Sequence, residues 1–85
     1  MTAEFFGTIR LRAGVASAEV GGATLGQALR RLAEVFPTLD GSVIVGDSVH
    51  RAFRVSLNGE RFVSDPQTPL EAEDRLLLLS ADVGG

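Results

Sequence analysis

The chain has 85 residues, of which 45% are hydrophobic, and a formal net charge of −3 at pH 7, which indicates one small globular domain. It has no Cys and one His, His50, so its composition excludes a disulfide framework, a thiolate nucleophile and a cluster of histidine metal ligands. All eight basic residues are Arg and acidic residues outnumber them, so the basic face that nucleic-acid binding needs is not expected.

The sequence also lacks the patterns of a membrane or secreted protein. No run approaches the ~18 consecutive apolar residues of a membrane-spanning helix. The N-terminus has neither the basic segment nor the apolar run of a signal peptide. We therefore expect no membrane partner and a cytoplasmic location, and we interpret His50 as a solvated loop residue.

The first predicted element is a strand over residues 4–12. Two sets of side chains alternate there with the period of a half-buried strand: Phe5, Gly7, Ile9 and Leu11 against Phe6, Thr8, Arg10 and Arg12. Ala13-Gly14 supplies a turn, and residues 16–20 alternate again, with Ala18 and Val20 on one side. These patterns predict an N-terminal hairpin that ends at Gly21-Gly22.

A helix is predicted from Thr24 to Phe36. Thr24 and Gln27 have the spacing of a capping box, and Pro37 disfavours helical geometry at the residue before it. The apolar stripe consists of Leu25, Ala28, Leu29, Leu32 and Phe36. The solvent-facing side consists of Gln27, Arg30, Arg31 and Glu34. Gly26 is unfavourable near a helix start, and close packing is one reason to retain it.

The second half of the chain predicts a loop, a hairpin and a final strand. Residues 38–52 form a long connection in which Val43-Ile44-Val45 is either a short strand or one helical turn. Residues 53–63 form a hairpin, because Asn58-Gly59 is the pair that a type I′ turn requires. An irregular segment with Asp65-Pro66 and Thr68-Pro69 follows, and Leu70 is expected in the core. Residues 75–79 form a strand whose unbroken leucines indicate a central position beside the first strand. A helix on one face of a mixed sheet makes this an α+β two-layer sandwich.

The six residues after this strand, 80–85, end in Gly84-Gly85. Glycine adds nothing to a core and loses the most backbone entropy on ordering. Without Cβ atoms, this end can thread a narrow slot and present a terminal carboxylate to another protein. The alternative is a frayed terminus that happens to end in glycine.

Together these pieces resemble the MoaD/ThiS-type β-grasp sulfur carriers, relatives of ubiquitin. The matching residues are Phe5-Phe6-Gly7, Thr24-Leu25-Gly26, Ala28-Leu29, Leu57-Asn58-Gly59-Glu60, Pro69-Leu70, Asp74 and Gly84-Gly85. The resemblance implies a β-grasp domain over residues 1–79 with a sheet of four to five strands and one main helix, and a flexible tail over residues 80–85. The family often has Asp-Gly-Asp where this chain has Ala72-Glu73-Asp74. Either Glu73 adopts a left-handed conformation there, or the turn differs.

The resemblance also implies a function. An E1-like adenylyltransferase would adenylate the Gly85 carboxylate, a sulfur donor would convert it to a thiocarboxylate, and a second, biosynthetic enzyme would receive the sulfur. Gly84, Val83 and Asp82 would thread the partner's slot. The chain would be a carrier and co-substrate, like the small subunit of molybdopterin synthase, and not an enzyme. It would bind no cofactor or metal, because ATP and its metal belong to the activating partner. The receiving pathway (molybdopterin, thiamine or cysteine) stays open.

Partner docking is expected on the sheet. If Leu76 and Leu78 point to the core, then Leu77 and Leu79 point away and form an apolar patch with Phe6 or Phe53. Alternatively, the irregular segment over residues 66–69 covers these leucines. An acidic group near the tail exit, Glu71, Glu73, Asp74 and Asp82, predicts a basic partner groove. Two other functions stay open: a ubiquitin-like modifier conjugated to lysines, and a plain interaction module.

Overall fold

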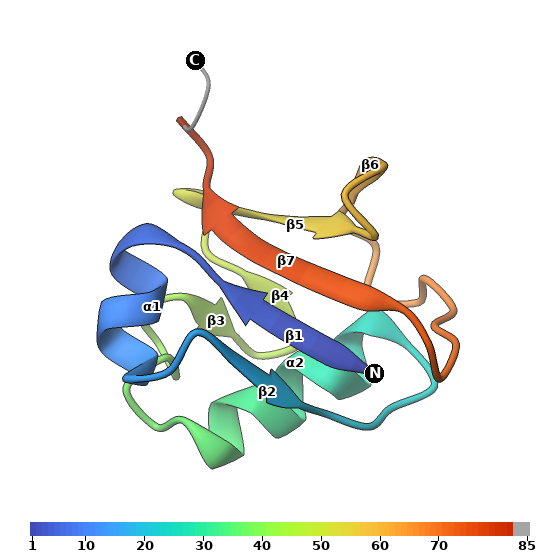
Figure 1. The fold of residues 1–85 in the computed structure, drawn as a ribbon, viewed down its shortest axis with the longest axis horizontal. Coiled ribbons are helices and arrows are strands. Elements are labelled where there is room, and N and C mark those ends of the chain that lie inside the picture. The colour runs from blue at the N-terminus through green and yellow to red at the C-terminus, as the bar shows by residue number, and fades with distance from the viewer. Residues whose placement is uncertain (83–85) are drawn as a thin grey trace.

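The fold is a five-stranded mixed sheet with two helices packed on it, in a computed structural model that describes residues 1–82 (Figure 1). The elements are β1 (Thr2–Phe5), α1 (Gly7–Ala13), β2 (Ser17–Glu19), α2 (Leu25–Val35), β3 (Ile44–Val45), β4 (Ser48–Val49), β5 (Phe53–Leu57), β6 (Arg61–Val63) and β7 (Arg75–Ser80). The sheet order is β2-β1-β7-β5-β6, and β3 and β4 form a separate two-stranded ribbon. Since β1 and β7 pair in parallel and the other neighbours pair antiparallel, the predicted α+β class with a mixed sheet is confirmed.

The predicted first strand is wrong beyond Phe5. The chain leaves β1, remains extended at Phe6 and then turns into α1. Gly14 ends this helix in a left-handed conformation with φ of 79°, and its N–H donates to the Arg10 carbonyl. β1 and β2 do pair antiparallel, as expected, but a helix and not a tight turn connects them. One main helix was predicted, and α1 is a second, shorter one.

The burial of Ile9 and Leu11 explains this difference. A strand places both residues on one face, because side chains repeat every two residues. In α1 they lie on opposite sides of the helix: Ile9 is fully buried, whereas Leu11 is 81% exposed. The helical period instead aligns Ile9 and Ala13, which are four residues apart and contact one core. Residues 7–13 therefore fit both the strand period and the helical period, and tertiary packing selects the helix.

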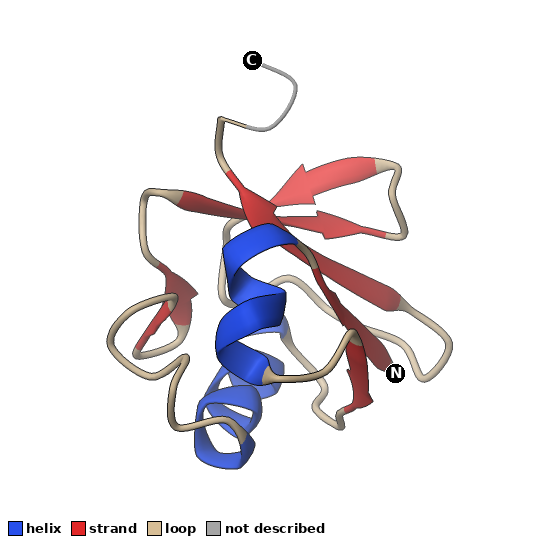
Figure 2. Cartoon of the chain, turned by 60° about the vertical axis from the view of Figure 1, so that its left-hand side comes forward, coloured by secondary structure: helices blue, strands red, loops and turns tan. Residues whose placement is uncertain are grey.

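The predicted helix over residues 24–36 is confirmed as α2. The Thr24 hydroxyl accepts a hydrogen bond from the Gln27 N–H, as a capping box requires. The Gln27 side chain accepts from the N–H of Ala23, one residue before the cap. The apolar stripe faces the sheet, so that Leu25, Ala28, Leu29 and Leu32 are all buried. In Figure 2 both helices lie on the same side of the sheet.

Close packing accounts for Gly26, near the start of α2. Its N–H donates to the Pro66 carbonyl at 2.9 Å. A Cβ at this position would lie 3.1 Å from the Cβ atoms of both Asp47 and Pro66. The irregular segment before β7 therefore packs so closely on the start of the helix that a side chain at residue 26 would crowd it.

The long connection over residues 38–52 contributes to the core. Val43-Ile44-Val45 is partly a strand, since β3 contains Ile44 and Val45 and pairs with β4. The side chains of Leu39, Val43 and Ile44 are fully buried against the rest of the core. This connection therefore closes the end of the helical layer and is not a plain surface loop.

The predicted hairpin and last strand are confirmed. Asn58 and Gly59 have φ of 59° and 70°, the positive values that their turn requires. Asn58 is the only non-glycine residue with positive φ in the described part of the chain. Glu73 is thus not left-handed, and the turn before β7 differs from the family pattern. β7 lies between β1 and β5, and its Leu76 and Leu78 are fully buried.

Candidate functional site

The base of the C-terminal tail is hydrogen-bonded to the start of β5 and the residue before it. Ser80, the last residue of β7, pairs with Phe53, and Ala81 donates its N–H to the Ala52 carbonyl at 2.8 Å. The Ser80 hydroxyl donates to the carboxylate of exposed Asp82, and this hydrogen bond lowers the pKa of Asp82. Figure 1 shows the chain leaving this end of the sheet. The other predicted tail residues, Val83, Gly84 and Gly85, lie outside the described residues, so their roles stay predictions.

Leu77 and Leu79 lie on the outer face of the sheet, opposite the helices. They alternate along β7 with Leu76 and Leu78, which are buried in the core, and are themselves half-buried. The alternative in which residues 66–69 cover them is not observed, because that segment hydrogen-bonds to the start of α2. The orientation expected for the two leucines is therefore present, and their role in docking remains a prediction.

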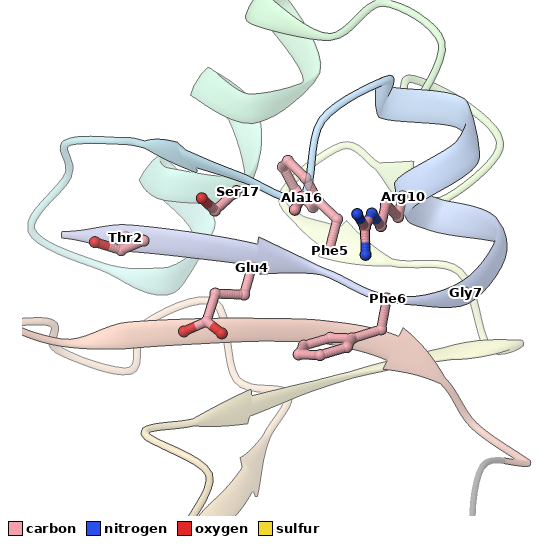
Figure 3. A pocket seen from close by; sticks show the side chains of 8 residues that line it. All are labelled: Thr2, Glu4, Phe5, Phe6, Gly7, Arg10, Ala16 and Ser17. Carbon is pink, nitrogen blue, oxygen red and sulfur yellow. The ribbon is translucent and has the colours of Figure 1, made fainter.

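The two predicted phenylalanines lie in different places. Phe6 is 43% exposed, and Figure 3 shows its ring directed toward β7. Phe53 instead alternates onto the core face with Val55, packs against the core and meets the His50 ring edge-on. The structure thus brings Phe6 to the face that carries the leucines but not Phe53. Phe53 stays a predicted contact that would have to act from the other face.

Phe62 is an outer-face residue that the sequence did not identify. It is 59% exposed and pairs with Ser56, which in turn pairs with Leu77 across the sheet. Whether Phe62 or Val63 faces the core depends on the hairpin register, which the sequence pattern of a three-residue strand leaves undetermined. We refer to Phe6, Phe62, Leu77 and Leu79 together as the outer patch.

The expected acidic group near the tail exit is wrong for three of its four members. Glu71, Glu73 and Asp74 precede β7, whereas the tail leaves after Ser80 at its other end. Six strand residues separate the two ends by roughly 20 Å. Of the four acids, only Asp82 lies at the exit. The prediction of a basic partner groove at the exit therefore loses its basis.

The exit is instead flanked by arginines. Arg54 pairs with Leu79 and holds its guanidinium carbon 5.3 Å from the centre of the Phe62 ring. Arg51 is exposed and lies one residue before Ala52. Both arginines line a cavity of about 300 Å³ with Val49, Phe53, Phe62, Val63 and Ser64. Neither forms a salt bridge within residues 1–82, so an acidic partner surface would complement them.

Solved structures of similar fold exist for several small proteins. SAMP1 from Haloferax volcanii is 28% identical, with a TM-score of 0.78 over 99% of this chain and 97% of that one. A chain of the BexX/CysO complex from Amycolatopsis orientalis is 22% identical, with a TM-score of 0.81 over 99% and 98% of the two chains. CysO from Mycobacterium tuberculosis is 21% identical, with a TM-score of 0.78 over 94% and 97%. No family model and no curated protein sequence matches the chain.

The chain has the ubiquitin-like β-grasp fold. The predicted resemblance to the MoaD/ThiS-type β-grasp family is thereby confirmed. As in the sequence-based expectation, the last strand of this β-grasp protein is central and releases the tail at an open end of the sheet.

A second cavity of the β-grasp fold lies between α1, β1 and β2, with a volume of about 440 Å³ (Figure 3). Arg10, Phe6 and Glu4 line it, and the Glu4 carboxylate is paired with the Arg75 guanidinium at 2.6 Å.

Residues 1–82 contain no group of three His, Asp or Glu side chains placed to hold a metal ion. None of their helices is long and apolar enough to cross a membrane.

Proposed function

We propose that this β-grasp protein is a sulfur carrier whose working group is the carboxylate of Gly85. The observation that carries the proposal is the exit geometry. The chain leaves a central strand at an open end of the sheet, immediately after the hydrogen bond from Ala81 to Ala52. A partner can therefore hold the rigid domain and take up the residues that follow. The outer patch and the arginines beside the exit provide the surface for that contact.

The proposed chemistry occurs in two steps on the partner. A Gly85 carboxylate oxygen attacks the α-phosphorus of ATP, and pyrophosphate leaves, so that an acyl-adenylate forms. Hydrosulfide then attacks the acyl carbon, AMP leaves with the oxygen that it had bonded, and a thiocarboxylate remains. The partner, an E1-like adenylyltransferase, holds ATP and its metal. The carrier contributes a carboxylate and a tail without bulky side chains at Gly84 and Gly85, which lets the partner exclude water from the adenylate.

The loaded tail then transfers its sulfur to a biosynthetic enzyme of molybdopterin, thiamine or cysteine type. In this proposal the chain is a co-substrate and has no catalytic side chain. Its eight basic residues are all Arg, so it contains no side-chain amine that could attack the activated tail. Self-acylation of the loaded carrier on a lysine is therefore not possible.

Intact mass spectrometry tests the proposal directly. The mass of the purified protein first establishes that the mature chain ends at Gly85. Incubation with the cognate adenylyltransferase, ATP and sulfide should then exchange one terminal oxygen for sulfur. Deletion of Gly85 should abolish this change while the unfolding midpoint remains that of the full chain. Loading that survives the deletion would contradict the proposal.

A second candidate is a protein modifier that is joined to lysines of other proteins. It is favoured by the 28% identity to SAMP1 from Haloferax volcanii. The protein of the same name from Methanosarcina acetivorans is called a small archaeal modifier protein. The same incubation with added cellular protein distinguishes the two functions. Isopeptide-linked adducts that carry the C-terminal peptide support the modifier, whereas a thiocarboxylate alone supports the carrier. An unchanged mass with both would indicate a plain interaction module.

A further inference from the structure

Asn58, in the turn between β5 and β6, is tied to the start of β7 by three hydrogen bonds. Its backbone N–H donates to the Arg75 carbonyl at 2.8 Å, and its side-chain oxygen accepts from the Arg75 N–H at 2.8 Å. Its side-chain nitrogen donates to a carboxylate oxygen of Asp74 at 3.0 Å. We call Asn58, Asp74 and Arg75 the turn lock. The side-chain oxygen of Asn58 thus meets a backbone N–H, which can only donate, and its side-chain nitrogen meets a carboxylate oxygen, which accepts.

The turn lock connects more of the fold than the hairpin alone. The second carboxylate oxygen of Asp74 accepts from the Glu71 N–H at 2.8 Å, which closes the turn before β7. The Asp74 carbonyl accepts from the N–H of Thr2 at 3.2 Å. The start of β1, the turn before β7 and the β5–β6 hairpin therefore meet at one carboxylate residue.

The residue after Asn58 makes this position chemically labile. Asn58 is the only Asn of the chain, and Gly59 follows it without a side chain to shield its backbone nitrogen. That nitrogen can attack the Asn58 side-chain carbonyl carbon. The bond to the side-chain nitrogen breaks, ammonia leaves, and a cyclic succinimide forms. Water then opens one of its two C–N bonds, which yields aspartate or isoaspartate at this position. Asparagine is among the thermolabile residues for this reason.

We propose that Asn58 is a spontaneous deamidation site, that the turn lock protects it in the folded chain, and that the deamidated product releases the lock. Protection follows from the contacts. Attack by the Gly59 nitrogen requires the side chain of Asn58 to rotate away from Asp74 and Arg75, so that the hairpin must open locally first.

Release follows from charge and geometry. An aspartate at this position has no side-chain N–H to donate to Asp74, and it places a second carboxylate where a hydrogen bond of 3.0 Å now lies. Two carboxylates at that separation cannot both remain ionised without a large cost. The isoaspartate product also adds one main-chain carbon to a turn that fixes the pairing of Leu57 with Arg61. Both products therefore loosen the end of β7 that is farthest from the tail.

The first experiment compares deamidation rates in the folded and the urea-unfolded chain at the same mildly alkaline pH. Intact mass and peptide mapping report conversion at Asn58 without ambiguity, because no other Asn is present. We expect conversion in the folded chain to be slower by roughly tenfold or more. Asp74→Ala removes the acceptor of the side-chain nitrogen and should bring the folded rate toward the unfolded one. Equal rates in the folded and unfolded native sequence would overturn the protection.

The second experiment exchanges the two partners. Asn58→Asp should lower the unfolding midpoint because it places two carboxylates side by side. Asp74→Asn should lower it because one of its amide N–H groups would face the backbone N–H of Glu71 or the side-chain N–H of Asn58. The double variant Asn58→Asp with Asp74→Asn can restore every bond. The exchanged carboxylate then accepts from the Arg75 N–H and from the exchanged amide, while the oxygen of that amide accepts from the Glu71 N–H. We expect the midpoint of the double variant to exceed that of either single variant.

Two results would overturn the release of the lock. One is an Asn58→Asp variant as stable as the native chain. The other is a double variant no more stable than the more stable single variant, because carboxylate repulsion would then not be the cause. Neither measurement depends on the proposed sulfur-carrier function, so the two proposals fail separately.

Discussion

Ala81 donates its backbone N–H to the carbonyl oxygen of Ala52 at 2.8 Å, one residue beyond the end of β7. Together with the pairing of Ser80 and Phe53, this bond sets the direction in which the chain leaves the sheet. Three residues follow Asp82, and fully extended they span at most about 10 Å. A partner that acts on Gly85 must therefore come close to the exit, where the domain presents the outer patch and two arginines.

The first prediction concerns the width of the partner's slot. Gly84→Ala adds a Cβ to the tail and should slow adenylation by roughly tenfold, or about 1.4 kcal/mol of transition-state stabilisation. The rate of pyrophosphate release at saturating ATP measures this effect. Gly21→Ala is the matched control, because its new Cβ would meet only the movable end of the Arg31 side chain. Equal rates for the Gly84 variant and the native chain would exclude a slot that admits only glycine.

The second prediction concerns charge at the exit. Arg51→Glu should raise the KM of the carrier in adenylation by roughly two- to fivefold, since exposed charges contribute modestly to association. The increase should shrink as ionic strength rises, because salt screens exposed charges. Arg31→Glu makes the same change in net charge on the exposed side of α2, away from the outer patch, and should leave KM near the native value. Greater activity for the Arg51 variant would point to a basic partner surface.

Local signals in the sequence were sufficient for much of the fold. Thr24 and Gln27 define the start of α2 by their own side chains, and Asn58-Gly59 defines the hairpin turn through backbone geometry. Both rest on contacts within a few residues, so a single sequence contains the information. The central position of β7 was likewise predicted from its unbroken leucine run. In the structure the helices cover only the face of Leu76 and Leu78, and Leu77 and Leu79 are half-buried on the other face.

The features that the sequence did not predict depend on distant contacts. Residues 7–13 fit a strand as well as a helix, and the core pocket that Ile9 fills decides between them. The outward orientation of Phe62 depends on the register with β5, which its own short strand does not reveal. The charges were misplaced for a related reason. Glu71, Glu73 and Asp74 are close to the tail in sequence, but a full strand separates them from it in space.

The third prediction tests α1 with two substitutions of similar chemistry. Ile9→Ala removes a fully buried side chain and should lower the free energy of unfolding by about 2–5 kcal/mol. Leu11→Ala removes a side chain that is 81% exposed and should change it by less than about 0.5 kcal/mol. Urea denaturation of both variants provides the comparison. A strand over residues 4–12 would place both side chains on one face, so similar losses for the two variants would contradict the helix.

The fourth prediction concerns the pH dependence of the turn lock. The hydrogen bond from the Asn58 amide, followed by that from the Glu71 N–H, lowers the pKa of Asp74 below its ordinary value of 3.8. Because the pKa is lower in the folded state, the unfolded chain binds this proton more readily. The stabilising contribution is therefore fully present above the unfolded pKa, and it is lost as pH falls through the folded pKa.

Carboxyl NMR titration of the native chain should thus show Asp74 titrating below 3.8. Asn58→Ala removes the largest cause and should move the Asp74 pKa upward, with a smaller loss of stability between neutral pH and acid. Asp82 serves as an internal control in the same spectra, because its pKa is lowered by Ser80 at the other end of β7 and should not respond. An Asp74 titration that is unchanged by Asn58→Ala would show that the amide does not stabilise this carboxylate, and the charge argument for release of the turn lock would fail with it.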